Sequence, residues 1–375
     1  MRGPLVSLVM RGGPAAAFAV LLCLAAPAAR AESPAAIPAV PPSGQWRGLH
    51  IKVPTHRSLQ HTLRLFTDHL PALGVNILVV EVNYRYKWRS HPELSEGDLT
   101  FEDARKLTAT CRAAGILVVP QFQCLGHQSW QRHRNALLAR YPEFDESPDR
   151  PEGSIPARSW CPSHPGVKPL VFDLLDELVD AFQTPLLHVG LDEVQEIGRC
   201  SRCRGSSVSD LFSRTVVDLH DHLATRGVRM MMWADRLLDR KGGFGGFHDT
   251  SDSGTHLAIG SIPRDVVLCD WHYEPARSYA SVPYLLGQGF QVWPSAWNSL
   301  AAARGMRDAG RKSNPSATLG MLYTCWSCGR GAPGLLRALL GKPDGSEFDK
   351  QAVEVLNLIR TLRREEKRRP NEVDG

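Results

Sequence analysis

Two neighbouring carboxylates, Asp192 and Glu193, are the residues of this 375-residue chain whose type and placement most directly predict chemistry. They end the apolar run in the stretch LLHVGLDEVQE. Burying a carboxylate is costly, and each of two adjacent carboxylates raises the proton affinity of the other. A protonated acid beside an ionised one suits acid–base catalysis. The alternative interpretation is that both acids simply begin the next helix, where negative charge is stabilised.

Four tryptophans near the ends of four other apolar runs indicate a pocket with aromatic walls. Indole is large and its N–H needs a partner, so four of them at such positions exceed what core packing requires. Aromatic faces beside carboxylates suit a sugar ring, because its C–H faces pack on indole while its oxygens meet the acids. The tryptophans are Trp233, Trp271, Trp297 and Trp326.

The elements that must position these residues show in a recurring pattern. Four times an amphipathic stretch ends in glycine and passes directly into an aliphatic run, at Gly74, Gly115, Gly227 and Gly289. Glycine just past a helix end accepts the left-handed conformation, and a short apolar run after it suits a strand buried on both faces. The unit is therefore a helix followed by a parallel strand.

Counting all such runs predicts eight strands alternating with helices. The expected strands are 49–53, 75–82, 116–122, 186–190, 228–233, 266–271, 290–294 and 319–326. The expected helices are 56–73, 101–114, 167–182, 207–226, 278–286 and 299–309. This pattern predicts an α/β fold, a single (β/α)8 TIM barrel, whose chemistry lies at the C-terminal ends of the strands. A doubly wound open sheet is the alternative, but no glycine-rich phosphate loop opens any of these helices.

The two ends of the chain differ in composition from the expected barrel. Residues 1–31 combine two early arginines, an apolar run and the small-x-small pattern Ala-Arg-Ala, which predicts a signal peptide and export to a periplasm or beyond the cell. Residues 32–45 are rich in Pro, Ala and Ser and predict a disordered leader. Residues 46–345 would form the catalytic barrel, and 346–375 a C-terminal helix followed by the solvated charged tail LRREEKRRPNEVDG.

Charge and hydropathy exclude two kinds of partner. The net charge is +5, and residues 1–31 supply three of these charges through arginine and none through acids, which leaves +2 on the exported part. Without a basic stripe outside the tail we expect no nucleic acid partner. No later run is long and apolar enough to predict a membrane span.

The acid pair lies in a longer motif. His188-Val-Gly-Leu-Asp192-Glu193 resembles the H-x-G-x-D-E motif of glycoside hydrolase family 20, the β-N-acetylhexosaminidases. Three further segments are similar to the family's first strand, its third strand with the following turn, and the segment leading into the motif: WRGLHIKVP, VVPQFQCLGHQ and WCPSHPGVKPLVFDLLDELVDAF.

The resemblance implies hydrolysis of β-linked N-acetylhexosamine in an oligosaccharide or glycan, without a cofactor. In this family the 2-acetamido oxygen of the substrate replaces a protein nucleophile, and configuration is retained. Glu193 would protonate the leaving oxygen and then activate water. Asp192, kept ionised, would orient the acetamido N–H and balance the positive charge of the cyclic intermediate. Both acids can serve one substrate only if the strand ends or twists near Gly190, because consecutive strand residues face opposite sides.

The resemblance also implies substrate-binding residues. Arg47 would hydrogen-bond the 3- and 4-hydroxyls of the terminal sugar, although an arginine that precedes its strand could also form a salt bridge at the barrel bottom. His127 would sit behind the acid pair, with a loop-capping role as the alternative. Three tryptophans would wall the acetamido pocket, and two residues after the seventh strand would stand where the family places a tyrosine and an acid: Trp233, Trp271 and Trp326, then Trp297 and Asn298.

Other positions depart from the family pattern. The first strand ends in Lys52-Val53 instead of carrying an Asp, and the second reads VEVNYRYKWR instead of an H-x-H-x-x-D-D segment. The eighth ends Trp326-Ser327-Cys328 instead of Trp-Glu. The reacting centre is therefore matched better than the residues that read the hydroxyls, and the choice between gluco and galacto substrates stays open.

Eight of the nine cysteines follow the predicted signal peptide, and four of them form two C-x-x-C pairs, Cys200/Cys203 and Cys325/Cys328. Such pairs suggest zinc. The loops after the fourth and eighth strands lie on opposite sides of a barrel mouth, too far apart to share one ion. We therefore expect a disulfide in or near the Cys200 loop, and no metal.

Two other function classes remain open. A metal-dependent barrel hydrolase could use His50, His127, His188, His272 and Asp235. The first strand lacks the H-x-H pair that such enzymes usually show. A barrel that binds sugar without catalysis is the second alternative, and the retention of both acids argues against it, since a binder has little use for a costly carboxylate pair.

Overall fold

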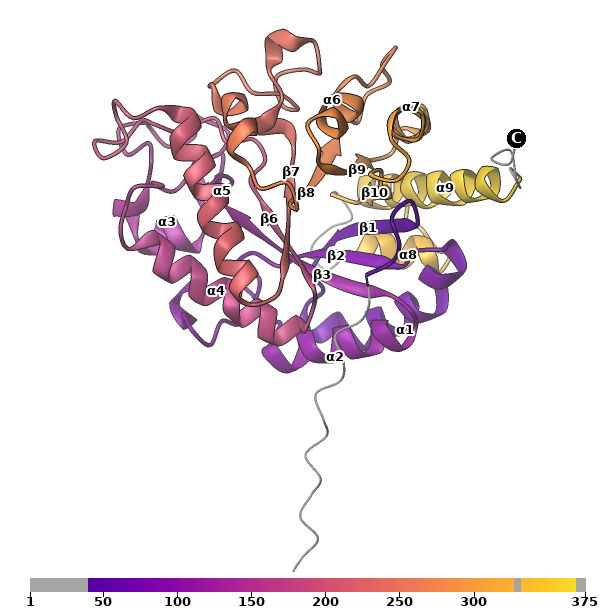
Figure 1. The fold of residues 1–375 in the computed structure, drawn as a ribbon. Coiled ribbons are helices and arrows are strands. Elements are labelled where there is room, and N and C mark those ends of the chain that lie inside the picture. The colour runs from indigo at the N-terminus through magenta and orange to yellow at the C-terminus, as the bar shows by residue number, and fades with distance from the viewer. Residues whose placement is uncertain (1–39, 327–331, 369–375) are drawn as a thin grey trace, which may run out of the picture. The chain divides into compact units, whose positions relative to one another are not determined.

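The computed structural model describes residues 40–326 and 332–368, and its centre is a closed barrel of eight parallel strands (Figure 1). Around the barrel the strands follow the order β1-β10-β9-β8-β7-β6-β3-β2. Their bounds are β1 Trp46–Lys52, β2 Ile77–Glu81, β3 Leu117–Cys124, β6 Leu186–Gly190, β7 Arg229–Trp233, β8 Val267–Trp271, β9 Gln291–Ala296 and β10 Gly320–Thr324. The predicted α/β fold, a single (β/α)8 barrel, is confirmed.

Helices cover the outside of the barrel and connect its strands (Figure 1). The longer ones are α1 His56–Leu73, α2 Phe101–Ala113, α4 Val167–Phe182, α5 Val208–Thr225, α6 Ser281–Gly287, α7 Leu300–Ser313, α8 Pro333–Leu339 and α9 Glu347–Arg368. The long connection after β3 holds a two-stranded hairpin, β4 Ser129–Trp130 and β5 His133–Arg134, and the short helix α3 Ala136–Arg140. Short 3-10 turns occupy Pro92–Leu94, Pro142–Phe144, Asp235–Leu237, Arg240–Gly242 and Thr255–Ser261.

Local sequence explains where these helices begin and end. The side chains of Thr55 and Thr100 each accept a hydrogen bond from the backbone N–H of the third helical residue. The side chain of that residue accepts one from the backbone N–H of the threonine, so α1 and α2 start in capping boxes. The four glycines of the recurring pattern all have positive φ, between 65° and 88°. The helix, glycine, strand unit read from the sequence is therefore present.

Two apolar layers lie on the two sides of the sheet. The inner cluster contains only residues of the strands and their edges, alternating along each strand, as in Ile77 and Val79 or Met231 and Trp233. Near the N-terminal ends the rings of Trp46 and Trp293 meet edge to face, 5.0 Å apart. A barrel interior filled in this way is a packed core.

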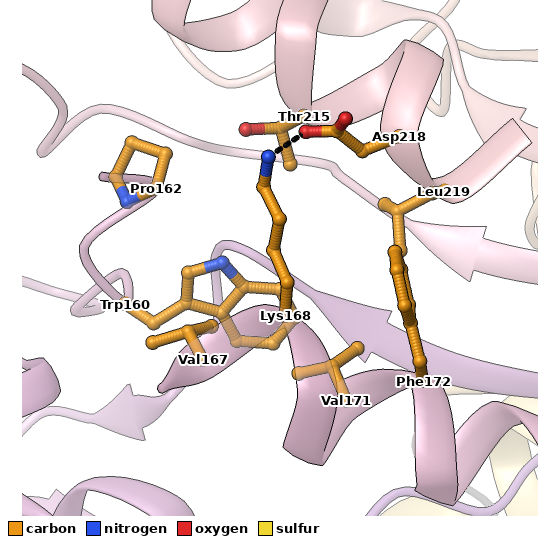
Figure 2. A pocket seen from close by; sticks show the side chains of 9 residues that line it. All are labelled: Trp160, Pro162, Val167, Lys168, Val171, Phe172, Thr215, Asp218 and Leu219. Atoms are coloured by element: carbon orange, nitrogen blue, oxygen red, sulfur yellow. Dashed lines mark ion pairs between the residues drawn. The ribbon is translucent and has the colours of Figure 1, made fainter. Parts of the chain in front are cut away.

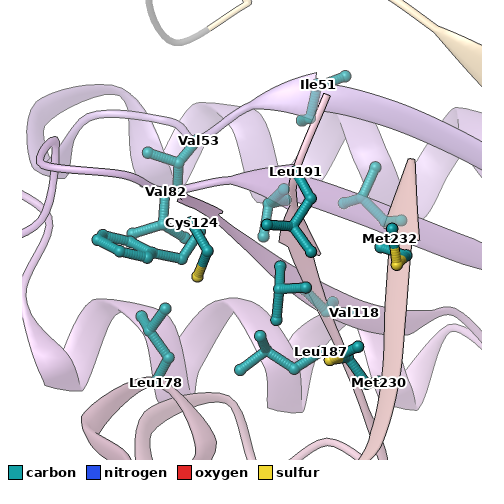
Figure 3. Packing of buried hydrophobic residues seen from close by; sticks show 14 of the residues in the cluster. Ile51, Val53, Val82, Val118, Cys124, Leu178, Leu187, Leu191, Met230 and Met232 are labelled. Carbon is teal, nitrogen blue, oxygen red and sulfur yellow. The ribbon is translucent and has the colours of Figure 1, made fainter. Parts of the chain in front are cut away.

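The outer layer packs the opposite strand faces against the helices. Figure 3 shows part of it, a cluster that contains Leu178 of α4 and residues of β1, β3, β6 and β7 such as Ile51, Val118 and Met232. Full burial of one aliphatic side chain contributes about 1.5–3 kcal/mol. The stable barrel wall fixes the positions from which the loops at its mouth depart.

The C-terminal segment differs from its prediction. Residues 362–368, expected in a solvated tail, continue α9. Glu365 pairs with Arg304 and Arg307 of α7, and Glu366 pairs with Arg47 and Arg311. Composition alone predicts a solvated tail for this charged run, because the arginines that pair with its glutamates lie far away in the sequence.

The remaining predictions about the chain's ends concern residues 1–39 and 369–375, which lie outside the described residues, as do Ser327 and Cys328. Within the part of the chain that the structure describes, no helix combines the length and apolar character needed to cross a bilayer.

Candidate active site

The acid pair follows a sharp backbone turn at the end of β6. Gly190, Leu191 and Glu193 have φ values of 68°, 72° and 50°, so three of four consecutive residues adopt left-handed conformations. Such a conformation is strained for a leucine or a glutamate. A Cβ on Gly190 would lie 1.7 Å from Gln123 Oε1, which explains why glycine occupies this position. The turn breaks the strand alternation and directs both acids into the same cavity.

Asp192 is buried and its two carboxylate oxygens have separate partners. Oδ1 accepts a hydrogen bond of 2.7 Å from Gln123 Nε2, and Oδ2 lies 3.3 Å from His127 Nε2. Burial alone would raise the pKa of Asp192, but the charge of His127 and the hydrogen bonds from His127 and Gln123 outweigh it and lower the pKa. The geometry therefore favours the ionised form of this acid.

Glu193 is held from three directions. Its Oε2 lies 3.1 Å from His127 Nε2, its Oε1 lies 2.7 Å from His248 Nδ1, and its backbone N–H donates to Asp235 Oδ2 at 2.9 Å. Suitable ligand atoms of His127, Asp192 and Glu193 all lie within 4.8 Å of one another. His127 thus contacts both acids.

The two neighbouring acids favour the charged form of His127. Burial would lower its pKa, but the carboxylates of Asp192 and Glu193 attract the proton more strongly and raise the pKa well above its usual value. The cation between the two acids offsets their repulsion. Its backbone has a φ of 54°, a conformation set by the turn after β3.

Asp235, which follows β7, connects the acid pair to the aromatic wall. Besides the N–H of Glu193 it accepts from Arg236 Nε at 2.6 Å and from Trp271 Nε1 at 3.3 Å. Burial raises the pKa of Asp235 to about 6, with Asp192 and Glu193 adding to the increase and Arg236 opposing it. Asp235 acts as a positioning residue for the turn that carries Glu193.

The acids open into a cavity of about 1020 Å³ with aromatic walls on one side. Trp233, Trp271, Tyr273 and Trp326 line it beside the acid pair. Trp326 Nε1 donates to the hydroxyl of Tyr273 at 2.7 Å, which fixes both rings. Three of the four tryptophans singled out in the sequence therefore line one cavity.

The opposite side of the cavity is polar and charged. Lys52 and Arg85 line it together with Glu81, whose carboxylate accepts from Asn83 Nδ2 at 2.9 Å. Asn83 Oδ1 in turn accepts from the backbone N–H of Gln123 at 2.8 Å. The ends of β1 and β2 thus supply polar side chains where the family's usual acids and histidines are replaced.

Two predicted site residues occupy other places. Arg47 lies at the N-terminal end of β1, away from the strand ends that carry the acids, and its guanidinium pairs with Glu366 at 3.4 Å. Asn298 Nδ2 donates to Glu354 of α9 at 2.7 Å. The predicted contacts of Arg47 and Asn298 with sugar are therefore corrected: the first is a barrel-bottom ion pair, and the second an attachment of α9.

Trp297 is also not among the residues that line the cavity. Its ring packs edge-on against Tyr273, with centroids 5.6 Å apart, so it supports the wall from behind. Tyr273, from the segment after β8, lines that part of the cavity instead.

The residues of the metal-hydrolase alternative do not converge. His50 and His188 lie fully buried inside the barrel, where burial lowers their pKa values to about 4 and about 3. His272 instead bonds Asp249 and Ser281. Among the described residues, the ligand cluster at the mouth contains only His127, Asp192 and Glu193.

Tyr273 and three further residues of the site were not predicted from the sequence. Gln123 and His248 bind the acids directly, and Trp130, 57% exposed, stacks on His127 at the rim with ring centroids 6.1 Å apart. Gln123 is in the quoted VVPQFQCLGHQ segment, so its place on the third strand could have indicated it. His248 lies in a long loop without regular pattern, and no local signal points to it.

A closed parallel barrel with a bridged carboxylate pair and aromatic walls at its C-terminal mouth belongs to the class of barrel proteins built for acid–base chemistry on small polar ligands. The model of the glycosyl hydrolase family 20 catalytic domain matches residues 45–276, and the chain belongs to this family.

Known proteins with similar sequence or structure agree. The beta-hexosaminidase of Akkermansia muciniphila is 27% identical over 191 residues, which cover 44% of this chain and 37% of that protein. The solved chitobiase of Flavobacterium johnsoniae superposes with a TM-score of 0.59 at 17% identity, covering 84% of this chain and 52% of that one. The β-N-acetylhexosaminidase of Bacteroides fragilis gives a TM-score of 0.61 at 16% identity, covering 84% and 66%.

The chain matches only a part of its curated relatives, 37% of the Akkermansia muciniphila protein and 29% of the beta-hexosaminidase subunit A2 of Dictyostelium discoideum. The solved structures support the fold, and the family match supports the kind of domain.

Proposed function

We propose that this protein is a glycoside hydrolase that removes β-linked N-acetylhexosamine from an oligosaccharide or glycan by the substrate-assisted retaining mechanism. One observation carries the proposal: the turn after β6 brings Asp192 and Glu193 into one cavity with His127 between them. Family membership and the beta-hexosaminidase relatives support the same activity.

Asp192 would act on the acetamido group. Its lowered pKa keeps it ionised at neutral pH, so it can accept a hydrogen bond from the acetamido N–H. That contact would orient the acetamido oxygen toward the anomeric carbon. As the oxazolinium ion forms, the carboxylate would stabilise its positive charge in a buried site, where electrostatic interactions are strong.

Glu193 would transfer the proton. It would donate a proton to the glycosidic oxygen as the bond breaks, and would then take one from the water that opens the cyclic intermediate. The backbone hydrogen bond to Asp235 and the contact with His248 would hold its carboxyl group in place through both steps.

The walls would bind the sugar ring. Trp233, Trp271 and Trp326 offer apolar faces for its C–H groups and for the acetamido methyl. On the other side Lys52, Glu81 and Asn83 are the side chains available for its hydroxyls.

Export is a further part of the proposal. The pattern of residues 1–31 supports delivery to the periplasm or outside the cell, where polymeric glycans would be accessible. Fractionation of cells that express the full chain, with mass spectrometry of the N-terminus, tests it. A protein that retains residues 1–31 in the cytoplasmic fraction would contradict it.

The activity is tested by hydrolysis of an aryl N-acetyl-β-glucosaminide and the matching aryl β-glucoside. We expect turnover of the acetamido substrate alone, and its near loss in Glu193→Gln. Glu143→Gln, an exposed glutamate outside the cavity, is the matched control and should retain full activity. If the protein hydrolyses neither the N-acetyl-β-glucosaminide nor a galactosaminide nor a chitin oligosaccharide, the proposal fails. A non-catalytic sugar-binding barrel would then explain the site better.

A further inference from the structure

Three cysteines and one glutamate meet in a buried cluster outside the active site. Cys161 Sγ lies 3.3 Å from Cys200 Sγ and 3.5 Å from Cys203 Sγ, and a carboxylate oxygen of Glu146 joins them, with all four ligand atoms within 4.8 Å of one another. The four residues are between 0 and 7% exposed. The sulfur separations exceed the ~2.05 Å of a disulfide bond, so the three side chains are present as thiols.

The glutamate of this cluster is unusual. Glu146 Oε1 accepts a hydrogen bond of 2.8 Å from the backbone N–H of Arg199, whereas the buried Oε2 has no hydrogen-bond partner. A buried carboxylate oxygen without a donor is costly unless a cation binds it. One carboxylate oxygen of Glu146 lies within 4.8 Å of the three sulfurs.

Two separate segments supply the ligands, and both are held in place. Cys200 and Cys203 lie in a turn closed by hydrogen bonds from the N–H groups of Cys203 and Arg204 to the carbonyl of Cys200. The second segment begins at Glu146 and ends at Cys161. Trp160 and Pro162, the neighbours of Cys161, line a small pocket together with residues of α4 and α5, among them the Lys168–Asp218 ion pair (Figure 2).

We propose that Glu146, Cys161, Cys200 and Cys203 form a structural zinc site. Three thiolates and one carboxylate provide the four ligands that tetrahedral Zn²⁺ prefers, with Zn–S distances of about 2.3 Å and Zn–O distances of about 2.0–2.2 Å. Soft sulfur ligands select zinc over magnesium and calcium. Four protein ligands leave no open position, so the ion would stabilise structure and would not bind substrate.

Charge supports this assignment. Three thiolates and a carboxylate exceed the charge of the ion by two negative units, and the loop places Arg199, Arg202 and Arg204 immediately around the two cysteines. These cations offset the excess. Binding of zinc would release the thiol protons to solvent.

The site would fix a segment that matters for catalysis. Cys200 follows Glu193 by only seven residues, and Glu196 between them accepts from Ser147 Oγ at 2.8 Å. Zinc would therefore clamp the loop after the acid pair to the segment that starts at Glu146. Zinc binding does not depend on the proposed hydrolase activity, and the two can fail separately.

The sequence indicated only half of this site. Cys200-x-x-Cys203 suggested zinc, but the second pair, Cys325-x-x-Cys328, was expected too far away across the barrel mouth to share an ion, so we expected a disulfide in or near the Cys200 loop and no metal. The expected disulfide is wrong, because Cys200 and Cys203 are free. Cys325 takes part in a disulfide bond instead. The third sulfur comes from Cys161, a lone cysteine that precedes α4 and carries no spacing signal.

Metal content and thiol state of the purified protein test the proposal. We expect about one zinc per chain after equilibration with zinc and desalting, and a sulfur-to-metal charge-transfer band when Co²⁺ replaces it. Cys161→Ser and Cys200→Ser should lose the metal, Glu146→Gln should bind it at least tenfold more weakly, and Cys111→Ser, a buried cysteine of α2, should keep it. Glu193→Gln should also keep it, which separates this site from the acids of the mouth.

Because a cysteine variant could fail to fold, the wild-type protein provides a second measurement. Removing zinc with a chelator should lower the melting temperature, and adding zinc back should restore it. Absence of metal from protein reduced and then supplied with zinc would overturn the proposal. So would mass spectrometry that finds Cys161 disulfide-bonded to Cys200 or Cys203 in protein that had been purified with zinc.

Discussion

The two sides of the active-site cavity are built differently. On the β6 to β8 side the groups are connected: Asp235 joins the backbone of Glu193 to the indole of Trp271, and His127 joins the two acids. On the β1 to β2 side Lys52, Glu81 and Arg85 extend from strand ends, and the Arg85–Glu81 contact is 3.7 Å long. The first side matches the family motif, whereas the second, joined to it through Asn83 and Gln123, departs from it.

This difference separates chemistry from recognition. A reacting centre tolerates little displacement, because a misplacement of about 1 Å can cost a hundredfold in rate. Hydroxyl contacts can be replaced one at a time, since each contributes only a modest free energy. The comparison therefore predicts that substitutions on the β6 side change kcat, whereas those on the β1 to β2 side change KM.

The largest effect is expected when two single variants are compared, each with a substitution at one of two glutamates that face the same cavity. Glu193→Gln should lower kcat by about 10²–10⁴, the range for loss of a general acid and base. Glu81→Gln should lower kcat/KM by about tenfold or less. Steady-state kinetics with an aryl N-acetyl-β-glucosaminide measure both, and equal losses would show that the two sides do not differ in role.

A second prediction concerns the turn itself. Gly190→Ala should lower kcat by about a hundredfold, because the new Cβ would displace Gln123 and with it Asp192. Strain in the left-handed conformation should also reduce the free energy of unfolding by about 1–3 kcal/mol. Gly115→Ala is the matched control, with φ 76° but open space around it, and it should lose stability without losing kcat.

A smaller effect is expected at the end of β1. Lys52→Met should raise KM roughly tenfold with little change in kcat, because a charged hydrogen bond to substrate contributes about 1.5 kcal/mol. Lys87→Met, at an exposed lysine near the same edge, serves as control. A fall in kcat with unchanged KM for Lys52→Met would place this lysine in the chemistry and contradict the division of roles between the two sides of the cavity.

The smallest expected effect is a dependence of stability on pH. His127 has a raised pKa, so its contribution is fully present below its unfolded value of about 6.5 and is lost as pH rises through the folded value. Asp192 has a lowered pKa, so its contribution is present above about pH 3.9 and is lost as pH falls through the folded value.

Both contributions are therefore present between about pH 4 and 6.5. The difference in melting temperature between wild type and His127→Gln should decrease as pH rises on the alkaline side of this window. Thermal melts from pH 5 to pH 10 measure it, and a difference that grows with pH would contradict the charge assigned to His127.

The sequence was sufficient for the fold because the signals there are local. Glycine at each helix end and a continuous apolar strand after it repeat along the chain, and β6, α1 and α4 match their predicted bounds. The acid pair could be predicted from the sequence as well, because the motif and the strand end lie within the same eleven consecutive residues.

Other features could not be predicted because they depend on distant partners. Arg47 was assigned to sugar by its position in a motif, but its side chain meets Glu366, more than three hundred residues away. His248 reaches Glu193 from an irregular loop, and Cys161 meets Cys200 only after two loops pack. In each case the sequence shows the residue type but does not show which residue it contacts in the folded protein.

The barrel can close only after its last strand has been synthesised, because β1 pairs with β10 and Arg47 forms an ion pair with α9. The first strand of the barrel is made early, yet one of its two edges stays unpaired until the last strand has been made, some 270 residues later. An open edge of this kind can pair with other chains. The barrel therefore closes late, and the unpaired edge of β1 has to be kept from other chains until the C-terminal part of the protein has been synthesised.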